Sequence, residues 1–102
     1  MNKALFSLSF DADKNIIHVS GELSFATVNS VLSQSKGVFE PVADLKIDLA
    51  AVTRSDSAGV ALLIDWMRSA KDKSKKIVFH NIPEQMLAIA GASGLDELLP
   101  LQ

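Results

Sequence analysis

The chain has 102 residues, 48% of them hydrophobic, which suits one compact domain over residues 1–102. Ten basic and twelve acidic side chains give a net charge of −2, without the basic excess that nucleic-acid binding requires. The absence of cysteine excludes disulfides, thiolate catalysis and cysteine-ligated zinc. With no signal-peptide pattern and no apolar run near the ~20 residues of a membrane span, we expect a soluble, cytoplasmic protein.

The first twenty residues predict a β-hairpin. Phe6, Leu8 and Phe10 alternate with serines, which is the two-residue period of a strand. Turn-forming residues follow at 11–15, and a second strand pattern occupies 16–20. Two strands joined by a short polar link most simply form an antiparallel hairpin at one edge of a sheet.

The middle of the chain predicts a helix, a strand and a second helix. Ser24 is the expected N-cap of a helix that begins near Phe25 and ends near Gly37, because Gly commonly follows the last helical residue. Clean alternation at 45–49 predicts a strand, and helical spacing then predicts a helix over 57–71.

The last third predicts one more strand and one more helix. A basic run at 71–76 precedes the apolar tetrad 77–80, which indicates a buried parallel strand reached by a right-handed crossover. Pro83 opens a further helix, and 95–99 forms a short terminal segment. The elements together predict an α/β fold with the order β-β-α-β-α-β-α.

The helix expected at 57–71 has two different faces when it is projected at ~100° per residue. The expected core face consists of Val60, Leu63, Ile64, Met67 and Ala70. The opposite face consists of Ser57, Ala58, Ala61, Asp65, Arg68, Ser69 and Asp72, with Leu62 on its flank. That second face is small and apolar in its first half and charged in its second half, which is typical of a protein interface. Trp66 lies at the border and fits either core packing or an interface anchor.

The start of that helix is the strongest candidate for a binding site. A first helical turn presents unpaired N–H groups and partial positive charge, so an acceptor from a partner or a phosphate is favoured there. We expect the small residues Ser57, Ala58 and Gly59 to leave these amides accessible. The simpler alternative is that Asp56 or Ser57 is only an N-cap, worth ~1 kcal/mol. A capping residue can also line a contact, so the two interpretations are compatible.

Two motifs carry a resemblance to a known family. Gly21-Glu22-Leu23 before the first helix and Asp56-Ser57-Ala58-Gly59 at the second resemble the STAS domain of anti-sigma-factor antagonists and their relatives, over essentially the whole chain. The resemblance implies a STAS fold, with a mixed sheet of about four to five strands packed with about four helices. The segment 52–63, with Ala70-Lys71, Leu87-Ala88 and Leu98-Leu99-Pro100, is similar to the small STAS subunit of Mla-type phospholipid-transport ABC complexes.

This resemblance implies a non-catalytic accessory subunit that binds the complex's cytoplasmic ATPase at the inner face of the inner membrane. It would stabilise or activate that ATPase and so support outer-membrane lipid asymmetry. In that family the hydroxyl residue after the Asp lies at the contact, and here it is Ser57. No cofactor and no metal is expected. The expected partner-binding residues are Arg54, Asp56, Ser57, Ala58, Gly59, Ala61, Leu62, Asp65 and Arg68.

The alternative function is an anti-sigma factor antagonist whose binding to a kinase is switched by phosphorylation. Such antagonists carry Asp-Ser-Ser-Gly and are phosphorylated on the second Ser, where this chain has Ala58. Ser57 would then be the acceptor. Self-association through a sheet edge or helix face also stays open.

Other polar residues carry weaker signals. His18 and His80 fall in expected strands without metal-ligand spacing, and Asp48 and Asp56 lack an accompanying nucleophile. The basic run 71–76 is most simply a solvated loop, with contact to an anionic membrane surface as its alternative.

Overall fold

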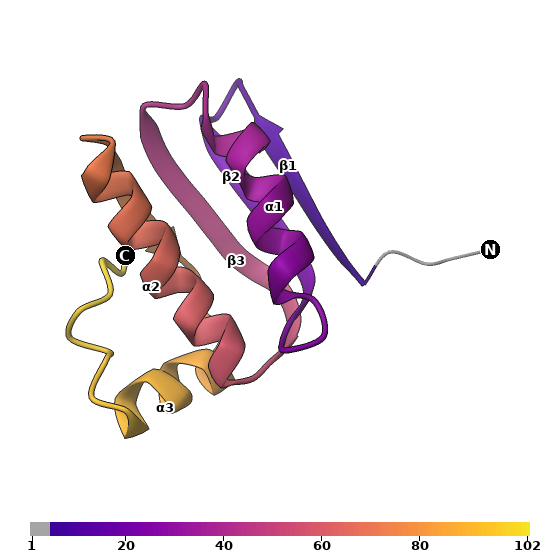
Figure 1. The fold of residues 1–102 in the computed structure, drawn as a ribbon, viewed down its shortest axis with the longest axis vertical. Coiled ribbons are helices and arrows are strands. Elements are labelled where there is room, and N and C mark those ends of the chain that lie inside the picture. Colours follow the sequence, from indigo (N-terminus) through magenta and orange to yellow (C-terminus); the bar gives the residue numbers. More distant parts are fainter. Residues whose placement is uncertain (1–4) are drawn as a thin grey trace.

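The computed structural model describes residues 5–102 and contains a four-stranded sheet and three helices. Figure 1 shows α1 and α2 across one face of the sheet, with α3 packed near the N-terminal end of α2. The expected α/β fold and its element order are confirmed; residues 1–4 lie outside the described residues. The elements are β1 (Phe6–Asp11), β2 (Ile16–Leu23), α1 (Val28–Phe39), β3 (Asp44–Ser55), α2 (Ser57–Asp72), β4 (Lys76–His80) and α3 (Glu84–Ala92).

The sheet is mixed, with the strand order β1-β2-β3-β4. β1 and β2 form the expected antiparallel hairpin at one edge, while β2–β3 and β3–β4 are parallel pairs. Ile17 pairs with Ile47, and Ile47 pairs with Phe79, so these three side chains lie in one row on one face. All three are fully buried, which identifies that face as the one covered by the helices.

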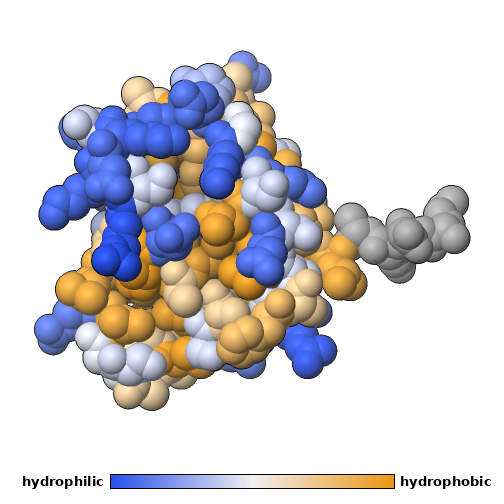
Figure 2. All heavy atoms as spheres, in the orientation of Figure 1, coloured by the Kyte–Doolittle hydropathy of each residue, from blue (hydrophilic) through white to orange (hydrophobic). Residues whose placement is uncertain are grey.

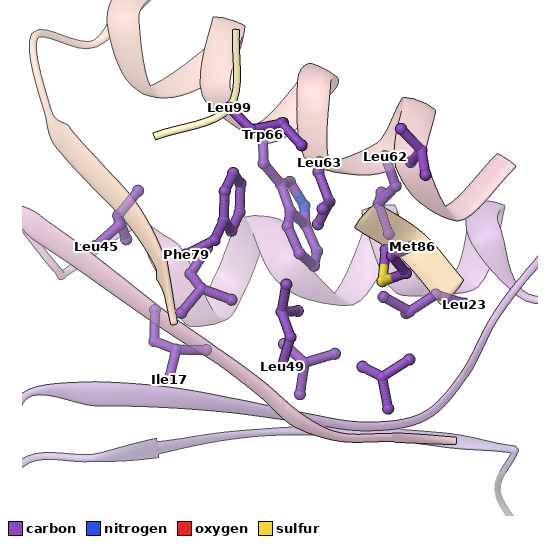
Figure 3. Close-up of a cluster of buried hydrophobic side chains, with 14 of the residues drawn as sticks. Ile17, Leu23, Leu45, Leu49, Leu62, Leu63, Trp66, Phe79, Met86 and Leu99 are labelled. Carbon is purple, nitrogen blue, oxygen red and sulfur yellow. The ribbon is translucent and has the colours of Figure 1, made fainter. Parts of the chain in front are cut away.

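The core fills the space between this face and α2. Figure 3 shows Leu63 and Trp66 of α2 pointing toward strand side chains such as Leu49. Trp66 is 2% exposed, so its role is core packing. Its indole N–H donates to the Ser35 hydroxyl at 2.9 Å, and its ring meets Phe39 edge to face with centroids 5.1 Å apart. Both partners belong to α1, so Trp66 joins the two helices while satisfying its buried donor.

The first helix differs from the expectation at both ends. It begins at Val28 rather than near Phe25, because Ser24 does not cap it. Instead the Thr27 hydroxyl accepts the Ser24 N–H at 3.0 Å and donates to the Glu22 carbonyl at 2.8 Å, which closes 24–27 into a turn before the helix. The helix then continues through Gly37 to Phe39.

The other elements differ mainly in length and number. β3 extends to Ser55, well beyond 45–49, because β2 continues to pair with its second half. Pro83 is the N-cap of α3 rather than its first residue. The structure has three helices instead of about four, since 95–99 forms turns, and the Phe79 N–H donates to the Pro100 carbonyl at 2.9 Å. Within 5–102 no helix is long and apolar enough to cross a membrane.

Polar side chains contact one another on the face of the sheet that the helices do not cover. His18 Nδ1 lies 3.2 Å from Asp48 Oδ2, and the Asn81 amide donates to Asp48 Oδ1 at 3.0 Å. Partial burial by itself would raise the pKa of Asp48. The hydrogen bonds from Asn81 and from the Ala50 N–H, together with the charge of His18, have the larger effect. The pKa of Asp48 is therefore lower than its ordinary value. Residues 5–102 contain no group of three or more His, Cys, Asp or Glu side chains that could hold a metal ion.

The lowered pKa of Asp48 predicts a specific loss of stability in acid. Its stabilising contribution is complete above the unfolded-state pKa of about 3.9 and is lost as pH falls through the lower folded-state value. We expect Asp48→Asn to be less stable than the parent near neutral pH but to lose less stability on acidification. Denaturation midpoints measured across this range test the expectation, with Asp72→Asn as an exposed control. Parallel profiles for Asp48→Asn and the parent would contradict it.

Candidate functional site

Asp56 caps α2 and occupies its first amides. Its backbone is extended (φ −133°, ψ −166°), and its Oδ1 accepts the N–H groups of Ala58 at 2.9 Å and Gly59 at 3.4 Å. The expectation that the amides of Ala58 and Gly59 are open to a ligand is therefore wrong. Asp is among the best N-cap residues because its short carboxylate reaches the donors of the first turn.

The second oxygen of Asp56 reaches a distant part of the chain. Oδ2 accepts the N–H of Phe25 at 3.1 Å, and the Asp56 N–H points to the Leu23 carbonyl at 3.4 Å. One side chain therefore links the start of α2 to the turn before α1. As a result, Phe25 is held beside the first turns of α2.

Gly59 is a packing residue rather than an accessible one. A Cβ at this position would overlap the Leu23 carbonyl oxygen and the Ser55 hydroxyl, so the absent side chain lets α2 approach the ends of β2 and β3. Gly59 is buried, Ala58 is 8% exposed and Leu62 is 2% exposed. The expectation that Ala58 and Gly59 are accessible is wrong, and Leu62 is buried rather than at the flank of an exposed face, because α1 and α3 contact α2 in addition to the sheet.

All but one of the remaining predicted residues are exposed. Asp56 is half-buried. The exposed ones follow the outer side of α2 at helical spacing, with one more at the end of β3: Ser57, Ala61, Asp65, Arg68 and Arg54. Their exposure makes them accessible to a partner, and binding itself stays a prediction.

An apolar groove runs beside this exposed row. It has a volume of about 340 Å³ and is lined by Phe25, Val28, Leu32, Ala58, Ala61, Leu62 and Asp65. The nearly buried Ala58 and Leu62 form its floor, while Phe25 is 74% exposed at its wall. Figure 2 shows hydrophobic atoms gathered toward the N-terminal end of α2 and hydrophilic atoms toward its other end. We name these seven residues the α2 groove.

Phe25 lies exposed at the wall of the groove, although it was not among the expected partner-binding residues. The sequence predicted a helix that begins near this residue. The signal that identifies it is the turn chemistry of Ser24 and Thr27, which stops the helix from starting before Val28. A large apolar side chain in such a turn is exposed unless another element covers it.

Comparison with known proteins identifies the family to which the chain belongs. The family described as "Mlab, STAS domain" matches residues 6–100. The chain belongs to this STAS family. A relative with comparable length, the intermembrane phospholipid transport system binding protein MlaB of Haemophilus influenzae, is 30% identical over 97 residues, which cover 90% of this STAS domain and 91% of that protein.

Solved structures show the same STAS architecture. An anti-sigma factor antagonist from Mycobacterium paratuberculosis matches with a TM-score of 0.72 and 20% identity, covering 94% of this chain and 84% of that one. The phosphorylated Bacillus cell fate determinant SpoIIAA matches with a TM-score of 0.65 and 20% identity, covering 95% and 90%. At these identities the likeness establishes the fold, and the expected STAS fold is confirmed.

The packing role of Gly59 predicts opposite effects at two helical glycines. Gly59→Ala should destabilise the protein by about 1–3 kcal/mol, because the added methyl overlaps the Leu23 carbonyl and the Ser55 hydroxyl. Gly37→Ala places a methyl in open space within α1 and should stabilise by about 0.5–1 kcal/mol. Chemical denaturation of both variants measures the difference. A Gly59→Ala variant as stable as the parent would show that α2 does not need this close approach.

Proposed function

We propose that this STAS domain is a non-catalytic accessory subunit of a Mla-type phospholipid-transport ABC complex. It binds the cytoplasmic ATPase of the complex through the α2 groove and the exposed row beside it, and it stabilises or activates that ATPase at the inner face of the inner membrane. The observation that carries the proposal is the groove itself, in which a 74% exposed Phe25 stands over nearly buried Ala58 and Leu62. The family match and the name of the Haemophilus relative support the choice of partner.

The chemistry of this surface suits a protein partner. Aromatic side chains, Phe included, are enriched at protein interfaces, and Phe25 is exposed beside the apolar groove. Ser57 and Ala61 are small, so a partner backbone can approach α2 closely. Asp65 and Arg68 supply charge further along the helix, where it orients a partner more than it strengthens binding.

The same geometry gives little support to catalysis. The carboxylate next to Ser57 belongs to Asp56, and it already accepts three backbone N–H groups. An acceptor engaged in this way is poorly suited to take a proton from a hydroxyl. The shape and the surface residues of the groove therefore favour binding over catalysis.

The docking surface predicts a set of variants that lose the complex but keep the fold. Ser57→Glu and Ala61→Glu place a charge against the partner, and Phe25→Ala removes the exposed ring, so each should weaken binding to the ATPase at least about tenfold. Folding should persist because all three positions are exposed. Copurification with the ATPase and titration calorimetry measure the loss, and circular dichroism checks the fold.

The matched control is Ser33→Glu, which makes the same change on an exposed position of α1 outside the groove. It should copurify with the ATPase as the parent does. Groove variants that bind as tightly as Ser33→Glu would exclude the α2 groove as the contact.

The second candidate is an anti-sigma factor antagonist with an anti-sigma kinase as its partner. The fold shared with SpoIIAA and the exposure of Ser57 favour it, although Ala58 occupies the position of the usual acceptor. Phosphate on Ser57 would add roughly −1.5 to −2 charge next to Asp56. The leading proposal predicts that incubation with such a kinase and ATP leaves the intact mass unchanged. A mass increase that Ser57→Ala abolishes would support the second candidate instead.

A further inference from the structure

A second hollow lies between α1 and α2, toward the C-terminal ends of both helices. It has a volume of about 160 Å³ and is lined by Leu32, Ser35, Lys36, Phe39, Leu45, Asp65, Trp66, Ser69, Ala70, Lys73 and Lys75. We name it the lysine pocket. Three of its lining residues are lysines and one is acidic, although the whole chain has a net charge of −2. The positive character of this pocket is therefore local and does not follow from composition.

Lys75 is held in place by the backbone around it. Ser74 adopts a left-handed conformation (φ 57°), which reverses the chain after α2, and the Lys75 N–H donates to the Ala70 carbonyl at 2.8 Å. The ammonium then donates to the carbonyls of Phe39 and Glu40, both at 2.9 Å. An ammonium has three N–H donors, so one remains for a ligand.

The other two lysines are more available. Lys73 makes an exposed ion pair with Glu40 at 3.3 Å, an interaction that contributes little to stability. Lys36 has no ion-pair partner among the residues that the structure describes. Lysines near helix C-termini also offset the helix dipole, which accounts for their place in the sequence. That role alone does not account for a hollow whose walls also carry the Ser69 side chain and two aromatic rings.

We propose that the lysine pocket binds a compact anion that carries a phosphate group. Phosphate oxygens accept charge-assisted hydrogen bonds from ammonium groups, and such bonds are roughly twice as strong as neutral ones. A volume of about 160 Å³ leaves room for a phosphate with a few carbon atoms. The apolar side chains of Leu32, Phe39 and Leu45 would face those carbons. A lipid headgroup and a free phosphorylated metabolite share this chemistry.

This inference is independent of the proposed ATPase partner. The lysine pocket and the α2 groove are nevertheless neighbours, because Leu32 and Asp65 line both. Trp66 provides a direct reporter for the pocket, since it is the sole tryptophan and its N–H is bonded to Ser35 at the pocket wall.

The test is a titration of the full chain with inorganic phosphate and with glycerol 3-phosphate, at constant ionic strength set by chloride. The NMR signal of the Trp66 indole N–H should move in a saturable way with at least one of the two anions. Lys36→Gln should weaken this binding by about tenfold, because it removes one charged donor. Lys71→Gln makes the same change of charge on an exposed lysine outside the pocket, and it should stay within about twofold of the parent.

Vesicles of phosphatidylcholine with and without phosphatidic acid then distinguish the two sources of the anion. Sedimentation that requires phosphatidic acid and is lost in Lys36→Gln assigns the pocket to a lipid headgroup. Saturable binding of the soluble anion without such sedimentation assigns it to a free metabolite. Absence of any saturable change, or equal losses in Lys36→Gln and Lys71→Gln, would overturn the proposal, because the lysines would then act only through general electrostatics.

Discussion

The α2 groove depends on the hydrogen bonds that the Asp56 carboxylate accepts. One oxygen begins α2 by accepting two amides of its first turn, and the other holds the Phe25 amide of a turn that lies 31 residues earlier in the chain. Beneath it, the missing side chain of Gly59 lets α2 lie against the ends of β2 and β3. The two walls of the α2 groove are thus positioned by the hydrogen bonds of Asp56 and by the close packing at Gly59.

Much of the fold follows from the hydrophobic period of the sequence. The hairpin, the parallel strands and the bounds of α2 could be predicted because alternation and helical spacing report burial on one face. The roles inside Asp56-Ser57-Ala58-Gly59 could not be predicted in this way. A small residue at the start of a helix fits an open surface and a tight packing contact equally well. The residues that pack against it in the tertiary structure decide between the two. For Gly59 that neighbour is Leu23, far away in the sequence.

The buried arc of α2 illustrates the same limit. A projection onto a single core face placed Ile64 and Met67 on that face and Leu62 on the flank of the opposite one. In the structure Leu62 and Trp66 are buried, while Ile64 and Met67 are only half-buried. The projection assumes one covering layer. In the structure α2 contacts the sheet, α1 and α3, so its buried arc turns toward the neighbouring helices. Which helix lies on which side of α2 is a property of the tertiary structure and has no local sequence signal.

The outer surface of α2 is apolar near its N-terminal end and charged near its C-terminal end. The apolar α2 groove and the lysine pocket therefore lie next to each other along this helix. Asp65 is exposed and lines both the apolar groove and the lysine pocket, so its charge acts on whatever occupies either one. An anion bound among the lysines would neutralise part of the positive charge near Asp65. A partner in the α2 groove would then meet a more negative potential at Asp65. Coupling of this kind must be reciprocal, and it should weaken as salt screens charges beyond about 8 Å. A neutral pocket of the same shape would leave the groove unaffected.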